Sequence, residues 1–153
     1  MVLRREDGTD FRECNSSSGK IRVWTLAKNL YVTQGEGHMQ DDHAAFLEEY
    51  GEERLRRAGG KVYIFHDWME MTGYDSKTRY KMTTWSAEHR ASFEEVHLAV
   101  RSRIVAMGVQ VANIALGGFM RAHTGVATLE LELARVLRLI GADGPRPSRL
   151  PSK

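Results

Sequence analysis

The sequence predicts an α/β protein with a mixed, mostly parallel sheet flanked by helices, and three observations support this prediction. Short apolar runs at residues 62–65, 96–100 and 119–122 are typical of buried strands. Helix-period patterns at residues 76–89 and 103–116 separate these runs. Strands that alternate with helices in this way usually pair in parallel, because a parallel pair needs a long crossover connection.

A hairpin and a helix are expected before this segment. Apolar and polar residues alternate at 21–25, and strand-forming residues resume at 30–33 after a turn. Asp41 and Asp42 can cap the next helix, which ends before a glycine pair. The whole order of elements is therefore expected to be β-β-α-β-α-β-α-β-α.

Two local features are expected in the second half of the chain. Ser102 stands directly before the helical pattern that starts at residue 103, where it can cap the helix. Gly108 belongs to the apolar stripe of that helix, and we expect it to permit close packing against the sheet. A last amphipathic helix follows the third strand of this segment.

One domain is expected, over residues 20–142, because 153 residues suit a single core. Residues 1–19 show no apolar period and predict a flexible N-terminal arm. Residues 143–153 contain three prolines and predict a flexible tail.

Composition narrows the classes of function. The 22 basic and 20 acidic side chains give a formal charge of +2, too small to indicate a nucleic-acid binder. Cys14 is the single cysteine, which fits a reducing compartment. The opening residues are charged and Ser-rich rather than apolar, so no secretory signal is expected. The sequence therefore predicts a cytoplasmic protein without a transmembrane segment.

The strongest likeness to a known family starts at Asp67, which is followed eight residues later by Asp75 and Ser76 at a predicted helix start. With the order of elements, this spacing resembles the STAS family, the sulphate-transporter and anti-sigma-factor-antagonist domains, and above all its single-domain, SpoIIAA-like antagonists. In that family an Asp-Ser-Ser-Gly motif opens the helix. Here Lys77 and Thr78 replace its Ser-Gly half.

The resemblance, which covers residues 20–142, implies a non-enzymatic regulatory module. Its partner would be an anti-sigma-type serine kinase or another signalling protein, and its phosphorylated serine would be Ser76. A phosphate at the first turn of a helix is also favoured by the helix dipole, although Asp75 or Ser76 can serve merely as an N-cap. The residues expected to carry phosphorylation or partner contacts are Asp67, Trp68, Met69, Tyr74, Asp75, Ser76 and Lys77, on a loop and helix start over 68–77.

Other functions stay open. A related group with the same general fold binds lipids or other apolar ligands, so a small-molecule or lipid-binding protein with a cavity between the last helices and the sheet is the alternative. The Trp- and Met-rich residues 68–71 either form an exposed adaptable surface or fold back on the sheet.

Four polar residues were expected just beyond strand ends, where open sheets bind ligands. This possible ligand edge consists of His66, Arg101, Ser102 and His123. The third hypothesis is a hydrolase-like enzyme that uses this ligand edge. No Gly-x-Ser-x-Gly elbow, P-loop or dinucleotide fingerprint is present, however. We therefore assign no catalytic residue. The six histidines lack metal-ligand spacing, and neither a metal nor a cofactor is expected.

Overall fold

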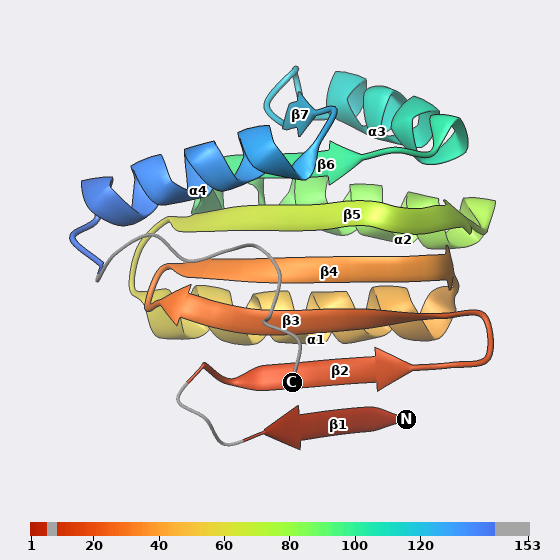
Figure 1. The fold of residues 1–153 in the computed structure, drawn as a ribbon, viewed down its shortest axis with the longest axis horizontal. Helices are drawn as coiled ribbons and strands as arrows, with labels where there is room; N and C mark the ends of the chain where they lie inside the picture. Colours follow the sequence, from red (N-terminus) through yellow and green to blue (C-terminus); the bar gives the residue numbers. More distant parts are fainter. Residues whose placement is uncertain (6–8, 143–153) are drawn as a thin grey trace.

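Within residues 1–5 and 9–142, which the computed structural model describes, seven strands form one mixed sheet in sequence order (Figure 1). The strands are β1 (Val2–Arg5), β2 (Phe11–Asn15), β3 (Gly19–Ala27), β4 (Leu30–Met39), β5 (Val62–Tyr74), β6 (Phe93–Val100) and β7 (Arg121–His123). The helices are α1 (Asp41–Ala58), α2 (Ser76–Glu88), α3 (Arg103–Ala115) and α4 (Val126–Leu139), with a short 3-10 helix at Arg90–Ser92.

Strand pairing divides the sheet into two halves. Neighbours from β1 to β4 are antiparallel, and neighbours from β4 to β7 are parallel. The helices α1, α2 and α3 each connect one parallel strand to the next. The predicted α/β class, the hairpin and the order from β3 to α4 are therefore confirmed. The antiparallel half is larger than expected, because the hairpin continues into β2 and β1.

The expectation of a flexible arm over residues 1–19 is corrected by β1 and β2. Cys14 pairs with Val2 on one side and with Ile21 on the other. Strand β2 was not predicted because the charged Arg12 occupies a position that is almost fully buried, which removes the usual apolar pattern of a strand. Its guanidinium is paired with Asp10 at 2.9 Å and with a glutamate of α1 at 2.7 Å. The expected tail over 143–153 lies outside the described residues.

Helices α1, α2 and α3 cover one face of the sheet, and α4 covers the other (Figure 1). Neighbouring residues on a strand point to opposite faces. Ile64 accordingly joins the core under α1 and α3, whereas Phe65 packs with Leu133 of α4. Two apolar layers therefore enclose the sheet, and the layer under α2 and α3 holds the cavity described below.

Strand β5 is much longer than predicted. It spans 13 residues to Tyr74, where the sequence predicted a loop from residue 66 onward. Polar residues broke the apolar run, but the structure buries them: Asp67 is 1% exposed and its carboxylate accepts a hydrogen bond from the backbone N–H of Met69 at 3.4 Å. The exposed contact loop over 68–74 is therefore not present.

The expected N-cap residue is found in α3 but not in α1. Ser102 caps α3 as predicted, since its hydroxyl accepts a hydrogen bond from the backbone N–H of Val105 at 3.4 Å. In α1 the N-cap is Gln40, one residue before the expected Asp41 and Asp42. Both aspartates still lie in the first turn, where they complement the helix dipole.

Candidate functional site

A cavity of about 90 Å³ lies between the sheet and helices α2 and α3. Its walls are largely apolar, with Met82 and Trp85 from α2 and Val109 and Ala112 from α3. The sheet contributes Tyr31, Thr33, Ile64, His66, Trp68 and Leu98. A mostly apolar cavity with a few polar groups is the usual form of a small-molecule site.

The two helices over this cavity are lightly anchored. In α2, all of which the structure describes, Thr78 alone is buried, and in the equally complete α3 only Val105 and Val109 are. Trp85 of α2 is half-buried, and its ring lines the cavity and packs at the edge of the core. Helices with few buried contacts open at low free-energy cost. The roof of the cavity is therefore the part of this layer that is best able to move.

One close contact attaches α3 to the end of β5. The Tyr74 hydroxyl donates a hydrogen bond to the carbonyl oxygen of Val105 at 3.1 Å. A Cβ atom at Gly108 would collide with that hydroxyl, so glycine is required for this approach. The expected role of Gly108 in close packing is confirmed, and its contact is the tyrosine at the end of β5.

His66 is the histidine in the cavity wall. Its Nδ1 lies 2.6 Å from Thr33 Oγ1, and Trp68 Nε1 donates to the same oxygen at 3.1 Å. Because the threonine oxygen accepts from the tryptophan, its own proton is free to be donated to Nδ1, and this arrangement favours the neutral Nε2–H tautomer of His66. Burial lowers the pKa of His66 to about 3. The ring is therefore neutral at physiological pH.

Two charged side chains also line the cavity, and both are half-buried. Glu48 reaches it from α1 and Arg79 from α2. Burial is the largest influence on Glu48, and its carboxyl pKa is raised above the ordinary value. The site thus offers a ligand an apolar interior, one neutral N–H donor, and a cation and an acid in its lining.

Three residues of the predicted phosphorylation and partner site lie together at the start of α2. Ser76 is the exposed first residue of α2, and Asp75 is its N-cap residue. The Asp75 carboxylate accepts a hydrogen bond from His38 Nε2 at 2.8 Å instead of capping the helix. Lys77 is also exposed, with its ammonium 3.5 Å from Asp41. Asp75, Ser76 and Lys77 therefore share one accessible helix start.

The other residues of that predicted set do not reach the surface together. Asp67, Trp68 and Met69 are buried, at 1%, 8% and 8% exposure. Trp68 belongs to the layer with the cavity, whereas Met69 packs on the α4 side. Of the two alternatives for this stretch, the structure shows the one in which it folds back on the sheet.

The predicted ligand edge is not brought together. His66 faces the cavity, but His123 lies on the α4 side, where its Nε2 is 3.1 Å from His97 Nδ1. Arg101 is exposed, with its guanidinium 3.7 Å from Glu70. Ser102 caps α3. The extension of β5 past residue 66 explains this outcome, since His66 lies within a strand and not at its end.

Glu95, His97 and Glu132 lie close enough to hold one metal ion, but two arginines already pair with the carboxylates, and Arg121 donates to Glu95 at 3.2 Å. Arg135 donates to Glu95 at 2.6 Å and also to Glu132. Its hydrogen bond is the largest influence that lowers the pKa of Glu132. A cation at this position would face the guanidinium, so the group is better explained as an ion-pair network that joins α4 to β6.

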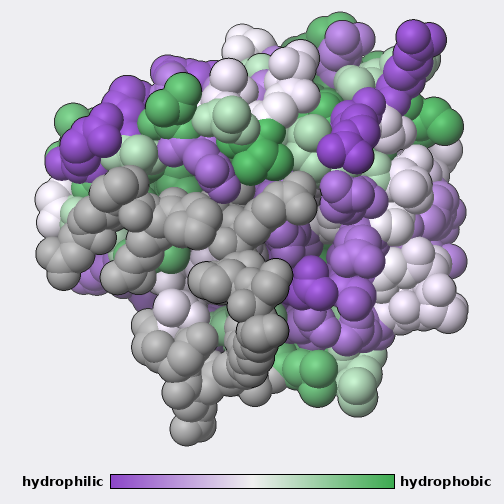
Figure 2. Space-filling view, in the orientation of Figure 1, coloured by the Kyte–Doolittle hydropathy of each residue, from purple (hydrophilic) through white to green (hydrophobic). Residues whose placement is uncertain are grey.

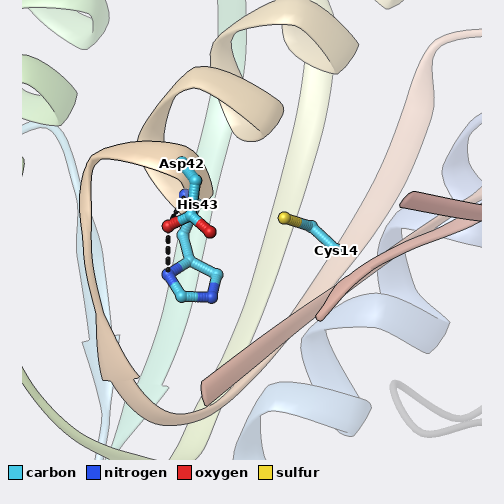
Figure 3. A group of neighbouring side chains, drawn as sticks. All are labelled: Cys14, Asp42 and His43. Carbon is cyan, nitrogen blue, oxygen red and sulfur yellow. Dashed lines mark hydrogen bonds and ion pairs between the residues drawn. The ribbon is translucent and has the colours of Figure 1, made fainter. Parts of the chain in front are cut away.

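Cys14, Asp42 and His43 form a second group of potential ligands (Figure 3). His43 Nδ1 accepts a hydrogen bond from the backbone N–H of Gln40 at 2.9 Å, so Nε2 carries the proton and faces the Gly19 carbonyl oxygen at 3.1 Å. Both ring nitrogens are thus used. Burial, followed by the Asp42 carboxylate, raises the pKa of the Cys14 thiol. The group therefore has a structural role.

Comparison with known proteins supports the fold. No protein-family model matches the sequence, and no curated protein matches it. A crystal structure of an uncharacterized protein of the DUF3478 family from Shewanella loihica PV-4, described as having a SpoIIAA-like fold, aligns with a TM-score of 0.55. The alignment has 13% sequence identity and covers 76% of this chain and 95% of that chain. This chain therefore has a SpoIIAA-like α/β fold, as the STAS resemblance implied.

Sequence reasoning missed Thr33, Arg79 and Trp85 as cavity residues. Strand alternation could have placed Thr33 on a sheet face, but no local signal indicated that this face borders a cavity. Among the described helices, none is long and apolar enough to cross a membrane.

Proposed function

We propose that this protein is a non-enzymatic binding module that holds a small, mostly apolar ligand in the cavity under α2 and α3. The observation that carries this proposal is His66, a neutral imidazole whose Nε2 has no hydrogen-bond partner within the described residues and which lies in an apolar wall. His66 is half-buried and lines the cavity, so its Nε2 is accessible to a bound molecule. A ligand oxygen that accepts from Nε2–H would satisfy it.

The size of the cavity limits the ligand. A volume of about 90 Å³ is small beside the roughly 300–1,000 Å³ of a usual ligand pocket. A larger ligand therefore requires α2 and α3 to move outward, which their few buried residues make inexpensive. The favoured ligand class is an apolar chain or ring with one carbonyl, ether or hydroxyl oxygen.

A hydrolase-like function is less well supported by the same geometry. Thr33 is the hydroxyl in contact with His66, but it is 0% exposed and also accepts from Trp68. A nucleophile must reach its substrate and needs an oxyanion donor beside it. Thr33 lies in the sheet floor, so we assign it a positioning role that fixes the His66 tautomer.

Native mass spectrometry of freshly purified full-length protein tests the proposal. We expect a retained ligand mass in the wild type, and its loss in Ala112→Leu, which adds bulk to the cavity wall. The matched control is Ala115→Leu, the same substitution at an exposed residue of α3 outside the cavity lining, which should retain the mass. If neither a retained mass nor saturable binding of the apolar dye N-phenyl-1-naphthylamine is observed, the proposal is wrong.

A second function, protein signalling switched at Ser76, is supported by the exposure of this serine at the start of α2. A phosphate there would interact with the helix dipole and lie near Lys77 and Arg79. By resemblance, the partner would be an anti-sigma-type serine kinase or another signalling protein in the cytoplasm. Phosphosite mapping of the protein isolated from its own host should find Ser76 modified; phosphate elsewhere, or at no serine, would remove this function.

A further inference from the structure

Helix α3 carries an apolar stripe on its outer face. We define the α3 stripe as Ile104, Met107, Val111 and Ile114, whose exposed fractions are 65%, 66%, 55% and 81%. The exposed polar residues of the helix are Arg103 and Gln110. In Figure 1, α3 lies at the margin of the molecule beside the short strand β7.

The apolar face of α3 is wider than the part that the sheet covers. Its inner face packs through Val105 and Val109 against the sheet, and its outer face is as apolar as the inner one. An amphipathic helix of a globular protein normally buries its whole apolar face, whereas α3 leaves part of that face exposed. Single exposed apolar residues are common on protein surfaces, but a contiguous row marks an interaction site.

The spacing within the stripe indicates which kind of surface covers it. The intervals from Ile104 to Met107, Val111 and Ile114 are three, four and three residues, which is the a/d pattern of paired helices. β-Branched residues occupy both a positions. In an antiparallel pair of identical helices, a positions face d positions, so Ile104 would face Ile114 of the other copy and Met107 would face its Val111.

We propose that α3 pairs with α3 of a second copy of this chain in antiparallel orientation. The two-fold axis would pass the outer face of the helix at the level of residue 109, midway along the α3 stripe. This proposal does not depend on a ligand in the cavity. Covering the stripe would remove roughly 500 Å² from each copy, or about 1,000 Å² in total, which is near the lower limit for a specific interface. We therefore expect a weak pairing, with a dissociation constant in the micromolar range.

Charge favours a second copy over an anionic membrane. Surface-binding helices usually carry several Lys or Arg residues beside the apolar face, but α3 has a single charged residue, Arg103, at its first position. In the antiparallel pair the two arginines lie at opposite ends and do not repel each other. The helix dipoles are also opposed. Because α3 is already folded, pairing has no cost of helix nucleation.

Sedimentation velocity of the full chain, from low to high micromolar concentration, tests this pairing. The wild type should shift from monomer to dimer. Ile104→Lys and Ile114→Glu should each weaken association by on the order of a hundredfold, because each buries an unpaired charge. An equimolar mixture of the two variants should recover dimers, since the antiparallel register places each lysine beside a glutamate.

The matched control is Leu131→Glu, which adds a charge at a residue of α4 that is 70% exposed and should leave the dimer unchanged. Circular dichroism verifies that each variant folds. A wild type that stays monomeric at every concentration overturns the proposal, as does a mixture that does not recover dimers. Monomeric protein that co-floats with vesicles of anionic phospholipid, and loses this in Met107→Glu, would assign the stripe to a membrane instead.

Discussion

Acidification should destabilise this fold through His66. In the folded protein, burial lowers the pKa of His66 from 6.5 to about 3. The unfolded chain therefore takes up a proton below pH 6.5 that the folded chain does not. The stabilisation is fully present above pH 6.5 and is lost as the pH falls from 6.5 towards 3.

The size of this effect follows from the shift. Each pH unit below the unfolded pKa removes about 1.4 kcal/mol from the free energy of unfolding. At about pH 5 the loss assigned to His66 is therefore on the order of 2 kcal/mol. Other groups also titrate in this range, so the difference between the wild type and a variant without the imidazole isolates the contribution.

Urea unfolding, followed by tryptophan fluorescence at about pH 8 and pH 5, measures this difference in the wild type and in His66→Phe. The variant loses the hydrogen bond to Thr33, which lowers its stability at both pH values, but its dependence on pH should be smaller by the amount above. An NMR titration of the wild-type ring should show no protonation between these two values. Equal pH dependence in both proteins, or a ring that titrates near 6.5 in the folded state, would refute the reasoning.

Three further outcomes can be measured by the same unfolding assay. Gly108→Ala should cost about 1–3 kcal/mol through its collision with the Tyr74 hydroxyl, and Tyr74→Phe should recover part of that loss. Ser102→Ala should cost about 1 kcal/mol, because it removes the N-cap of α3; an unchanged value would mean that the cap adds nothing. Glu53→Gln should remove the Glu53 contribution to acid sensitivity, because the hydrogen bond from Arg12, above all, lowers the Glu53 pKa to about 2. The wild type should then lose about 1–2 kcal/mol between pH 4.5 and 2 that the variant does not lose.

The parts of the fold that the sequence predicted have strong local signals. The helix over 76–89 was expected and α2 is found at Ser76–Glu88, and the helix over 103–116 matches α3 at Arg103–Ala115. In α3 a capping serine and a regular apolar spacing coincide, whereas α2 has a polar start but no regular apolar face. The missed strand β2 and the missed extension of β5 each bury a charged residue, since Arg12 in β2 and Asp67 in β5 are both nearly inaccessible. Their partners lie in other parts of the chain or in the backbone, and local composition does not reveal them.

The candidate site was harder to predict because it depends on which face of the sheet each residue takes. His66 and His123 were expected at one edge, yet a strand reverses its side-chain direction at every residue. Because β5 continues to Tyr74, His66 lies in the middle of the strand, on the face opposite His123. Position along the sequence made His66 a candidate ligand residue, but its register and the helices above it decide which cavity it lines.

Helix α3 connects the two proposals, because its inner face forms part of the cavity roof and its outer face carries the stripe. A ligand that fits within about 90 Å³ leaves the helix in place and should leave dimerisation unchanged. A longer apolar ligand must move the helix outward, which misaligns Ile104 and Ile114 of the two copies, so it should weaken the dimer; by linkage, dimerisation should weaken its binding by the same factor. Sedimentation velocity with a short and a long alkanol at saturation measures this, and equal association constants with both would mean that α3 does not move when the cavity fills.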